Sequence, residues 1–344
     1  MKMFRRSLLA SVAALSVLAA VPAQAQTVTL RLHHFLPPQA AIPATAITPW
    51  AKKIETESGG RIKVQIFPAM QMGGSPPQLF DQARDGVADI VWTVLGYTPG
   101  RFNRSEVFEL PFMCSGGGEK CSRAFQEYVD VHAADEFKSV KVLAVHTHGP
   151  GLFHTKQPVT GLESLRGMKI RGGSRVINNM LVKLGATPVG MPVPQVPEAL
   201  SKGVIDGATV PWEVAPSVKI PELVKNHTTF AGKDGLYSQT FAFVMNRGAY
   251  DKLPADLKKV IDSNSGMETA AMFGRSMDAA DKVGHDMAVK AGNNIVALDA
   301  AETQRWRRTA GVVETDWANE MKGKGLDGAK LVSDARALMA KYAK

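Results

Sequence analysis

The 344-residue sequence has only two cysteines, and it lacks the motifs that mark common catalytic sites. It contains no G-x-S-x-G elbow, no H-E-x-x-H, no P-loop and no G-x-G-x-x-G that opens a helix after a strand. It also lacks a basic run with interleaved aromatic residues, so we expect no nucleic-acid partner. Nothing here calls for a cofactor or for catalysis, although an enzyme stays an open alternative.

Long apolar runs are also scarce, and the one that occurs lies at the start of the chain. Three basic residues precede an apolar run from Leu8 to Val21, and Ala23-Gln24-Ala25 supplies small residues for cleavage. The run is about 14 residues long, against ~20 needed to span a bilayer. Residues 1–25 are therefore predicted to be a signal peptide and not a retained anchor. We expect a soluble exported protein, periplasmic in a cell with two membranes.

Cys114 and Cys121 lie in the stretch CSGGGEKC, whose glycines allow the chain to turn back. In an oxidising compartment this spacing predicts a local disulfide. A metal site is disfavoured because the spacing is not C-x-x-C and the loop has no histidine. Such a small loop would stabilise the fold by about 2–3 kcal/mol.

Size and charge narrow the class of protein further. About 319 residues remain after cleavage, which is more than one core usually organises, so two domains are expected. The formal net charge of +9 includes three cations of residues 1–25, which leaves +6. That excess is spread thinly along the chain, and a small anion remains a possible ligand.

Hydrophobic periodicity predicts alternating strands and helices in the first half. Residues 27–35 alternate as a strand, a helix follows and ends at Gly59 and Gly60, and residues 61–68 alternate again. A helix over about 76–84 then leads into a third strand that runs through Trp92. This order indicates an α/β domain with a largely parallel sheet.

The same plan occurs a second time. A strand closes at Arg171, a helix covers 174–186, a strand follows, and a last helix leads into a strand that runs to Trp212. The closing pieces DQARDGVADIVW and EALSKGVIDGATVPW correspond, each with a glycine, an aspartate and a final tryptophan at matching places. Two lobes of like plan should share a cleft at the carboxyl ends of their strands.

That rule selects residues at or just past the strand ends as ligand candidates. A further strand over 240–254 adds Asn246, and a helical run then continues to the C-terminus, with one long helix passing back across both lobes. The strand-end candidates are His33, His34, Phe35, 68–72, Trp92, Arg171, Met191, Pro192, Pro211 and Trp212.

Arg171, in MKIRGGSR, is the sharpest of these candidates. An arginine at the exit of a buried strand either pairs with a structural carboxylate or presents its fork of donors to a carboxylate from outside. Gly172 and Gly173 remove side chains where a ligand would lie. The predicted helix start at Ser174 also favours an anion.

The histidines are weaker candidates. His33 and His34 point to opposite faces of their strand, so at most one of them can face the cleft. His146 and His148 alternate on one side of a strand, with His154 nearby, and a metal site there is conceivable. Strand-end histidines satisfied by backbone and water are the better interpretation.

Several motifs, in order, resemble those of the solute-binding proteins of TRAP transporters, the tripartite ATP-independent periplasmic type, in the dicarboxylate-binding DctP-like family. This resemblance implies a type II-like bilobal periplasmic-binding-protein fold with crossing strands and a long helix. It also implies that Arg171 holds a ligand carboxylate and that permease membrane subunits are the partners. The motifs are FPAMQMGGSPPQLFDQARDGVADI (67–90), ELPFM (109–113), KQPVTGLESLRGMKIR (156–171), GATPVGMPVPQVPEALSKGVIDG (185–207) and NRGAYDKLPADLKKVI (246–261).

Two departures from the family pattern bear on the ligand. Many members carry a second arginine where this chain has Gly151, and an asparagine where it has Val210. Loss of both makes a second ligand carboxylate hard to satisfy in a closed cleft. Apolar side chains, among them Phe153, Trp92 and Trp212, remain. We therefore expect a monocarboxylate with an apolar or aromatic body, such as an aromatic, 2-oxo or 2-hydroxy acid, with a succinate- or malate-like dicarboxylate as the alternative.

The expected protein is a monomer that captures an organic acid and delivers it to a permease. Residues 26–148 and 237–276 are predicted to form lobe I, and 149–236 and 277–344 lobe II. A secreted lyase or hydrolase and a sensory subunit are the rival classes. The predicted ligand-binding residues are Arg171, His33, His34, Trp92, Phe153, Gly172, Met191, Val210, Trp212 and Asn246.

Overall fold

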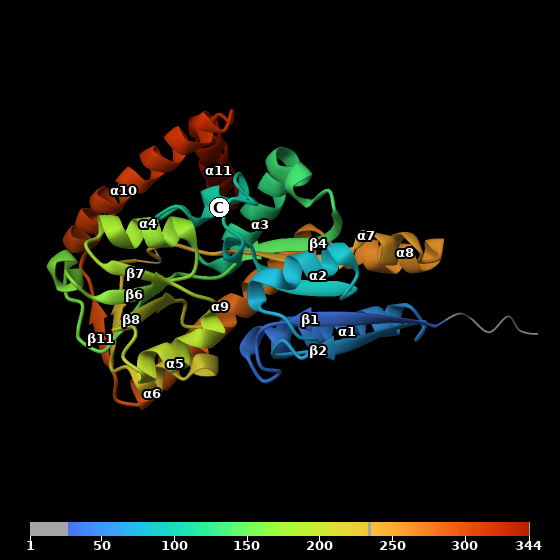
Figure 1. Ribbon diagram of the computed structural model, residues 1–344, viewed down its shortest axis with the longest axis horizontal. Helices are drawn as coiled ribbons and strands as arrows, with labels where there is room; N and C mark the ends of the chain where they lie inside the picture. Colours follow the sequence, from blue (N-terminus) through green and yellow to red (C-terminus); the bar gives the residue numbers. More distant parts are fainter. Residues whose placement is uncertain (1–26, 233–234, 344) are drawn as a thin grey trace, which may run out of the picture.

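Two α/β lobes lie side by side in the computed structural model, which describes residues 27–232 and 235–343 (Figure 1). Each lobe is built on its own sheet with helices packed against it, which confirms the predicted bilobal α/β fold. The predicted signal peptide lies outside the described residues. Within the described residues, no helix combines the length and the apolar character that a membrane crossing requires.

The first sheet has the strand order β2-β1-β3-β10-β4. β1 pairs in parallel with β2 and β3, whereas β10 runs antiparallel between β3 and β4. The carboxyl end of β10 therefore lies at the edge opposite to those of its neighbours. The strands are β1 (Val28–His34), β2 (Ile62–Phe67), β3 (Ile90–Val94), β4 (Val140–Thr147) and β10 (Thr240–Asn246).

The second sheet has the strand order β11-β9-β5-β8-β6-β7. β6 is parallel to β7 and β8, whereas β5 is antiparallel to β8 and β9. Each sheet thus receives one strand that runs against its parallel core. The strands are β5 (Leu152–Thr155), β6 (Lys169–Gly172), β7 (Thr187–Gly190), β8 (Gly207–Val210), β9 (Asn226–Thr229) and β11 (Asn294–Ala297).

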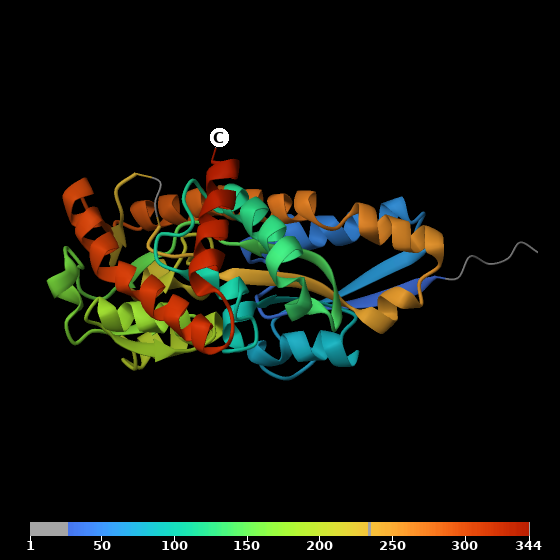
Figure 2. The same cartoon turned by 90° about the horizontal axis from the view of Figure 1, so that it is seen from above.

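Helices cover both sheets, and the long helix α9 (Met267–Lys290) passes from one lobe to the other (Figure 2). It packs on α3 and β4 of the first lobe, and its Gly284 lies against Trp212 of the second. The other helices are α1 (Thr48–Glu57), α2 (Leu79–Asp85), α3 (Gly118–Tyr128), α4 (Arg175–Lys183), α5 (Val196–Ser201), α6 (Ile220–Leu223), α7 (Arg247–Asp251), α8 (Ala255–Ser263), α10 (Ala300–Gly323) and α11 (Gly328–Tyr342).

Short 3-10 and π turns join these elements. The segment η4 will matter below because it packs against α4 and β10. The turns are η1 (Pro43–Ile47), η2 (Pro76–Gln78), η3 (Leu95–Tyr97), η4 (Ser105–Glu109), η5 (Val129–Ala133), η6 (Ala134–Phe137), η7 (Leu162–Leu165), η8 (Val193–Gln195) and η9 (Pro216–Val218).

The same pair of hydrogen bonds, made by an aspartate, occurs in both lobes at the matching stretches of sequence. In the first lobe, Asp89 accepts the backbone N–H of Arg31 at 2.8 Å and returns a bond from its own N–H to the Arg31 carbonyl at 3.0 Å. In the second lobe, Asp206 makes the same exchange with Lys169, at 2.8 and 2.7 Å. In both places an aspartate after a helix fixes the start of a strand to its parallel neighbour.

The described chain crosses between the sheets through residues 148–151, through the segments 230–232 and 235–239, and through α9. The first two crossing segments are bonded to each other: the Gly151 N–H donates to the Tyr237 carbonyl at 2.9 Å, and the Leu236 N–H donates to the Gly151 carbonyl at 3.0 Å. The division at residues 148/149, 236/237 and 276/277 stays a prediction. Of the C-terminal helices, α10 packs on α4 and α11 packs on α3.

The predicted disulfide is present. Cys114 and Cys121 are bonded, with their Cα atoms 5.5 Å apart. The bridge fixes the loop that leads into α3. Asp278 of α9 accepts the backbone N–H groups of Gly118 and Glu119 at 2.5 and 2.9 Å, which anchors the start of the same helix.

Candidate functional site

A buried cavity lies between the two sheets, and every residue that lines it is buried. The first lobe contributes side chains from β3, β10 and the segments after β1 and β3. The second contributes side chains from β6 and from the chain that follows β7 and β8. The lining residues are Phe35, Leu36, Trp92, Val94, Tyr97, His148, Arg171, Val193, Val210, Pro211, Glu213, Val214, Gln239 and Phe241.

Arg171 lies at the end of β6 and is 0% exposed. Its Nε donates to the Met191 carbonyl at 2.9 Å, and its Nη1 donates to the Thr209 carbonyl at 3.0 Å. Nη2 is buried and has no hydrogen-bond partner among the described residues. No carboxylate of the described residues lies within ion-pair distance of the Arg171 guanidinium either. The guanidinium is therefore held by neutral carbonyls, with one donor nitrogen left free.

The two glycines after Arg171 do not clear space for a ligand as predicted. A β-carbon on Gly172 would lie 2.2 Å from Oδ1 of Asn178, and one on Gly173 would lie 2.3 Å from Oε1 of Gln239. The space beside each glycine is thus filled by a side chain of the protein itself. Gly172 does not line the cavity, whereas Gln239 does, and its Nε2 has no partner in the described residues.

The helix start at Ser174 faces a carboxyl group of the protein and not the cavity. The predicted cap is present, because the Ile177 N–H donates to Oγ of Ser174 at 3.3 Å. Burial raises the pKa of Glu109 to about 7, and the nearby Ser174 opposes this rise. The α4 N-terminus therefore lies next to Glu109, and Ser174 is absent from the cavity lining.

Tyr237 fills the space beside Gly151. A β-carbon on residue 151 would lie 2.4 Å from Cε1 of the tyrosine ring. The Tyr237 hydroxyl is buried without a partner among the described residues, and burial raises its pKa to about 12 although the charge of Arg171 opposes this. A second tyrosine, Tyr97, accepts the Val193 N–H at 2.9 Å through its hydroxyl oxygen. Both phenols are uncharged donors close to Arg171.

Stacked aromatic rings form the apolar part of the cavity. Trp92 stacks on Phe35 with ring centroids 4.9 Å apart and on Phe241 with centroids 5.2 Å apart. Its Nε1 donates to Nε2 of His146 at 2.8 Å. Because the indole N–H is satisfied by His146, the tryptophan presents only its apolar surface to the cavity.

The histidines near the site are neutral and mostly occupied by internal bonds. His148 lines the cavity, but its Nδ1 bonds the Gly149 carbonyl at 2.6 Å and its Nε2 accepts the Gln239 N–H at 3.1 Å. Burial lowers its pKa to about 4 and that of His146 to about 3. Among the described residues no cluster of metal-ligating side chains occurs.

Neither histidine of the first strand lines the cavity. Nδ1 of His33 bonds Oε1 of Gln82 at 2.6 Å, and its Nε2 accepts the Met72 N–H at 3.3 Å. His34 has both ring nitrogens buried without partners among the described residues, and burial lowers its pKa to about 4. Their predicted contact with ligand therefore has no support from the cavity lining.

Three further predicted residues, Asn246, Phe153 and Met191, do not line the buried cavity. Asn246 caps α7 and donates to the carbonyls of residues 83 and 84, at the opposite end of its sheet, because β10 runs antiparallel to its neighbours. Phe153 points to the helical side of its sheet and packs on Trp306, with centroids 5.5 Å apart. Met191 contributes only its carbonyl, to Arg171.

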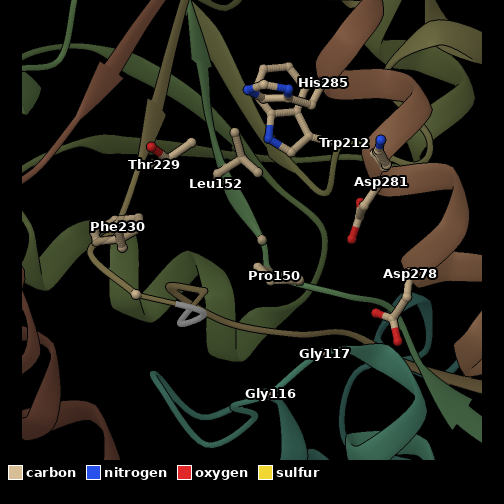
Figure 3. Close-up of a pocket in the computed structure, with 13 residues that line it drawn as sticks. Gly116, Gly117, Pro150, Leu152, Trp212, Thr229, Phe230, Asp278, Asp281 and His285 are labelled. Carbon is tan, nitrogen blue, oxygen red and sulfur yellow. The ribbon is translucent and has the colours of Figure 1, made fainter.

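Trp212 lines a second pocket instead (Figure 3). This pocket lies between α9 and the crossing segments, and Asp278, Asp281 and His285 of α9 also line it. The Trp212 ring packs on His154 and His285, with centroids 5.0 and 5.3 Å apart. Of the ten predicted ligand-binding residues, Arg171, Trp92 and Val210 line the buried cavity.

Sequence patterns missed most of the other lining residues, such as Tyr97 and Gln239, and also Tyr237, which lies close to Arg171 but is not among the lining residues. Tyr97, Tyr237 and Gln239 lie in turns or in a crossing segment, where no periodicity marks a side chain as facing a cleft. Phe35 and Pro211 belonged to the wider set of strand-end positions. The scarcity of tyrosine, five in the whole chain, is the one signal that singles out Tyr97 and Tyr237.

Known proteins resemble the chain over nearly its whole length. A family model described as bacterial extracellular solute-binding protein, family 7, matches residues 32–320. A TRAP solute-binding protein from Rhodoferax ferrireducens T118, solved with copurified benzoate, is 50% identical, with a TM-score of 0.90 over 92% of this chain and 99% of that chain.

Two further solved structures are similar. A marine metagenome TRAP solute-binding protein specific for aromatic acid ligands, solved with 3-hydroxybenzoate, is 50% identical over 93% of this chain and 100% of that chain, with a TM-score of 0.91. A TRAP solute-binding protein from Bordetella bronchiseptica, solved with (R)- and (S)-mandelate, is 31% identical over 91% and 99%, with a TM-score of 0.83.

Proposed function

The chain belongs to family 7 of the bacterial extracellular solute-binding proteins, as a solute-binding protein of the TRAP type, and from this premise we propose that it binds an aromatic monocarboxylate in the buried cavity through Arg171. Members of this family are periplasmic, bind small organic acids and work with a TRAP permease. We further propose that this chain is exported through residues 1–25, acts as a monomer and leaves its ligand chemically unchanged.

The observation that carries the proposal is the unpaired charge of Arg171. Burial of a cation without a counter-ion costs several kcal/mol, so a buried arginine normally has a carboxylate beside it. Here its Nη2 is free and two carbonyls hold the rest of the guanidinium. A carboxylate that enters the cavity supplies the missing charge and accepts a charge-assisted hydrogen bond from Nη2.

Neutral donors around Arg171 favour one carboxylate and not two. The Tyr237 hydroxyl and Nε2 of Gln239 are buried without partners, and each can donate one hydrogen bond to a carboxylate oxygen. Among residues 27–232 and 235–343 no second cation lines the cavity, and Val210 stands where a polar residue was expected for a dicarboxylate ligand. A second ligand carboxylate would therefore lose its hydration without gaining a counter-charge.

The stacked rings support an aromatic body for the ligand. Phe35, Trp92 and Phe241 offer flat apolar surface, and aromatic pairs gain about 0.5–1.5 kcal/mol beyond their buried area. The similar proteins that were solved with benzoate and with 3-hydroxybenzoate bound ligands of this kind.

Calorimetric titration tests this proposal. The protein is first unfolded and refolded to remove any ligand carried through purification, and it is then titrated with benzoate, succinate and benzamide. We expect benzoate to bind at least about 100-fold more tightly than succinate, because the second carboxylate lacks a partner. Benzamide has the same ring without the charge and should bind no better than succinate.

Tighter binding of succinate or malate than of any aromatic acid would overturn the proposal in favour of a dicarboxylate. Equal binding of benzamide and benzoate would show that Arg171 does not pair with the ligand. The ligand recovered after incubation is examined by proton NMR, where any conversion would support the rival enzyme class.

A further inference from the structure

Besides Arg171 and Gln239, the ligand cavity has a further polar side chain with a buried atom that lacks a hydrogen-bond partner among the described residues. Glu213 follows β8 by three residues, is 6% exposed and lines the cavity together with Arg171. Its Oε1 is buried and has no hydrogen-bond partner among the described residues. Its backbone N–H, in contrast, donates to Oδ1 of Asp281 at 2.7 Å, which fixes the position of the residue on α9.

Glu213 does not serve as the counter-ion of Arg171. Both residues line the same cavity, but no ion pair joins them, so their charged groups are more than 4.0 Å apart. A ligand whose carboxylate occupies the free nitrogen of Arg171 therefore leaves the carboxyl of Glu213 to another part of the ligand. The Arg171 guanidinium and the Glu213 carboxyl are thus two separate polar groups in the lining of one largely apolar cavity.

We propose that the un-ionised carboxyl group of Glu213 hydrogen-bonds a hydroxyl substituent on the ring of the bound aromatic acid and so selects hydroxylated over unsubstituted acids. This inference rests on the proposed function and extends it to the substituent on the ring. A protonated carboxyl has both an O–H donor and a carbonyl acceptor, and a phenolic hydroxyl can bond to either.

The charge state of Glu213 fits this role. Burial, together with the charge of the nearby Asp281, raises its pKa to about 8. A carboxyl that stays neutral at pH 7 does not repel the anionic ligand, and it keeps the proton that it would donate. This is the same reason for which some enzymes keep a buried carboxylic acid un-ionised as a hydrogen-bond donor.

The groups around Glu213 come from several elements. Asp281 contacts it from α9, and Arg171 and His148 line the same cavity. On its other side, Glu213 also lines an open groove with Lys219 and Arg275, and no ion pair joins either of them to it. Asp281 is the acidic neighbour that opposes ionisation, so removal of its charge should lower the pKa of Glu213.

Paired titrations with benzoate, 3-hydroxybenzoate and 4-hydroxybenzoate test the inference. The wild-type protein should bind one of the two hydroxybenzoates more tightly than benzoate. In Glu213→Leu this preference should fall by about 10-fold or more, while the affinity for benzoate is kept or improved. Glu213→Gln retains a donor and an acceptor and should keep part of the preference. Glu222→Gln, at an exposed carboxyl on α6, is the matched control and should behave as wild type.

The pH profile supplies an independent readout. The preference for the hydroxybenzoate should decline as the pH rises through about 8 in the wild type, where Glu213 ionises, and should stay flat in Glu213→Gln. The same preference in Glu213→Leu as in the wild type would overturn the inference, as would loss of all three ligands in both Glu213 variants. A wild-type protein that binds none of the three acids would instead refute the proposed function itself.

Discussion

The ring of Tyr237 lies against the Cα atom of Gly151, so close that a β-carbon there would be 2.4 Å from the ring. Gly151 is the position at which many family members are expected to carry a second arginine. In this chain a phenol occupies the neighbouring space, and the two residues are also bonded through their backbones. A neutral donor thus replaces a second cation near Arg171.

This relationship predicts the effect of Tyr237→Phe. The substitution keeps the ring that fills the space beside Gly151 and removes only the unpartnered hydroxyl. A hydrogen bond to a charged group contributes about 1.5–3 kcal/mol, so the affinity for benzoate should fall about 10- to 100-fold, as measured by calorimetry. The melting temperature of the ligand-free protein should not fall. Tyr250→Phe, on the surface, is the control, and an unchanged affinity in Tyr237→Phe would show that the hydroxyl does not reach the ligand.

Arg171→Met should abolish measurable benzoate binding, with a loss of at least about 100-fold, because the ligand carboxylate would be buried without a counter-charge. Stability should change little. Two bonds to carbonyls, each of about 1 kcal/mol, are lost, but a buried unpaired charge is removed as well. Urea denaturation measures the second effect.

Arg171→Lys separates charge from geometry. It keeps a cation but not the planar fork, and it should bind benzoate with intermediate affinity. A large loss of ligand-free stability in both variants would indicate a structural role for the arginine.

Arg175 and Glu106 form a tie between the lobes. Nε of Arg175, on α4, lies 2.6 Å from Oε1 of Glu106, on η4, and the two side chains are 22% and 8% exposed. Nη1 of Arg175 also contacts Glu320 at 2.7 Å. In Glu106→Gln we expect a several-fold loss of benzoate affinity, because η4 packs against the first lobe and the closed arrangement loses an ion pair.

A double-mutant cycle with Arg175→Gln measures the coupling between these two residues, which should be about 2 kcal/mol for a largely buried pair. The exposed pair Glu198–Lys202 serves as the control and should show no measurable coupling. If Glu106→Gln lowered the free energy of unfolding but left the benzoate affinity unchanged, the Arg175–Glu106 pair would have to persist when the lobes part.

Buried histidines make stability depend on pH. Nδ1 of His227 and Nδ1 of His154 lie 2.7 Å apart and are joined by a hydrogen bond. Nε2 of His227 is bonded to Nδ2 of Asn293 at 2.9 Å. Burial lowers the pKa of His227 to about 4 and that of His154 well below its usual 6.5. Below pH 6.5 the unfolded chain binds protons that the folded protein does not. The free energy of unfolding should therefore fall by up to about 1.4 kcal/mol per histidine and pH unit as the pH drops from 6.5 towards 4, and these histidines should cause no loss above 6.5.

Urea denaturation between pH 4.5 and 7.5 checks this dependence. His227→Gln should flatten the acid slope relative to the wild type. Carboxyls with raised pKa values, such as Glu109, act in the opposite direction, and a comparison between variants cancels their contribution. Identical slopes in the wild type and in His227→Gln would contradict the prediction.

The sequence sufficed for the parts of this protein that local pattern determines. Period-2 and period-3.6 runs predicted the order β1-α1-β2-α2-β3 and the order β6-α4-β7-α5-β8, but not the strands β5, β9 and β11. The short loop around Cys114 and Cys121 predicted their disulfide. The strand end at Arg171 placed one cavity residue, and two more, Trp92 and Val210, were among those predicted. The elements, the disulfide, Arg171 and Trp92 follow from neighbours in the chain, whereas Val210 came from comparison with the family pattern.

The rest depends on contacts between distant segments. Asn246 was misplaced because the direction of β10 within its sheet is set by tertiary pairing and not by its own residues. At Gly172 and Gly173, the side chains of Asn178 and Gln239 fill the space that a β-carbon would need. A sequence shows that a glycine lacks a side chain, but it does not show which residue fills the space beside it. The role of Tyr237 likewise depends on a crossing segment that returns from the other lobe.

The burial of the residues that line the cavity has a consequence for timing. Each of them is buried, and Arg171 is 0% exposed, so we expect a bound acid to exchange with solvent mainly when the lobes part. The residence time of a ligand is then limited by how often the lobes part, whatever the strength of its own contacts. Two acids of different affinity can leave no faster than this common rate. We expect that a surface that held the lobes apart would speed the release of a bound acid.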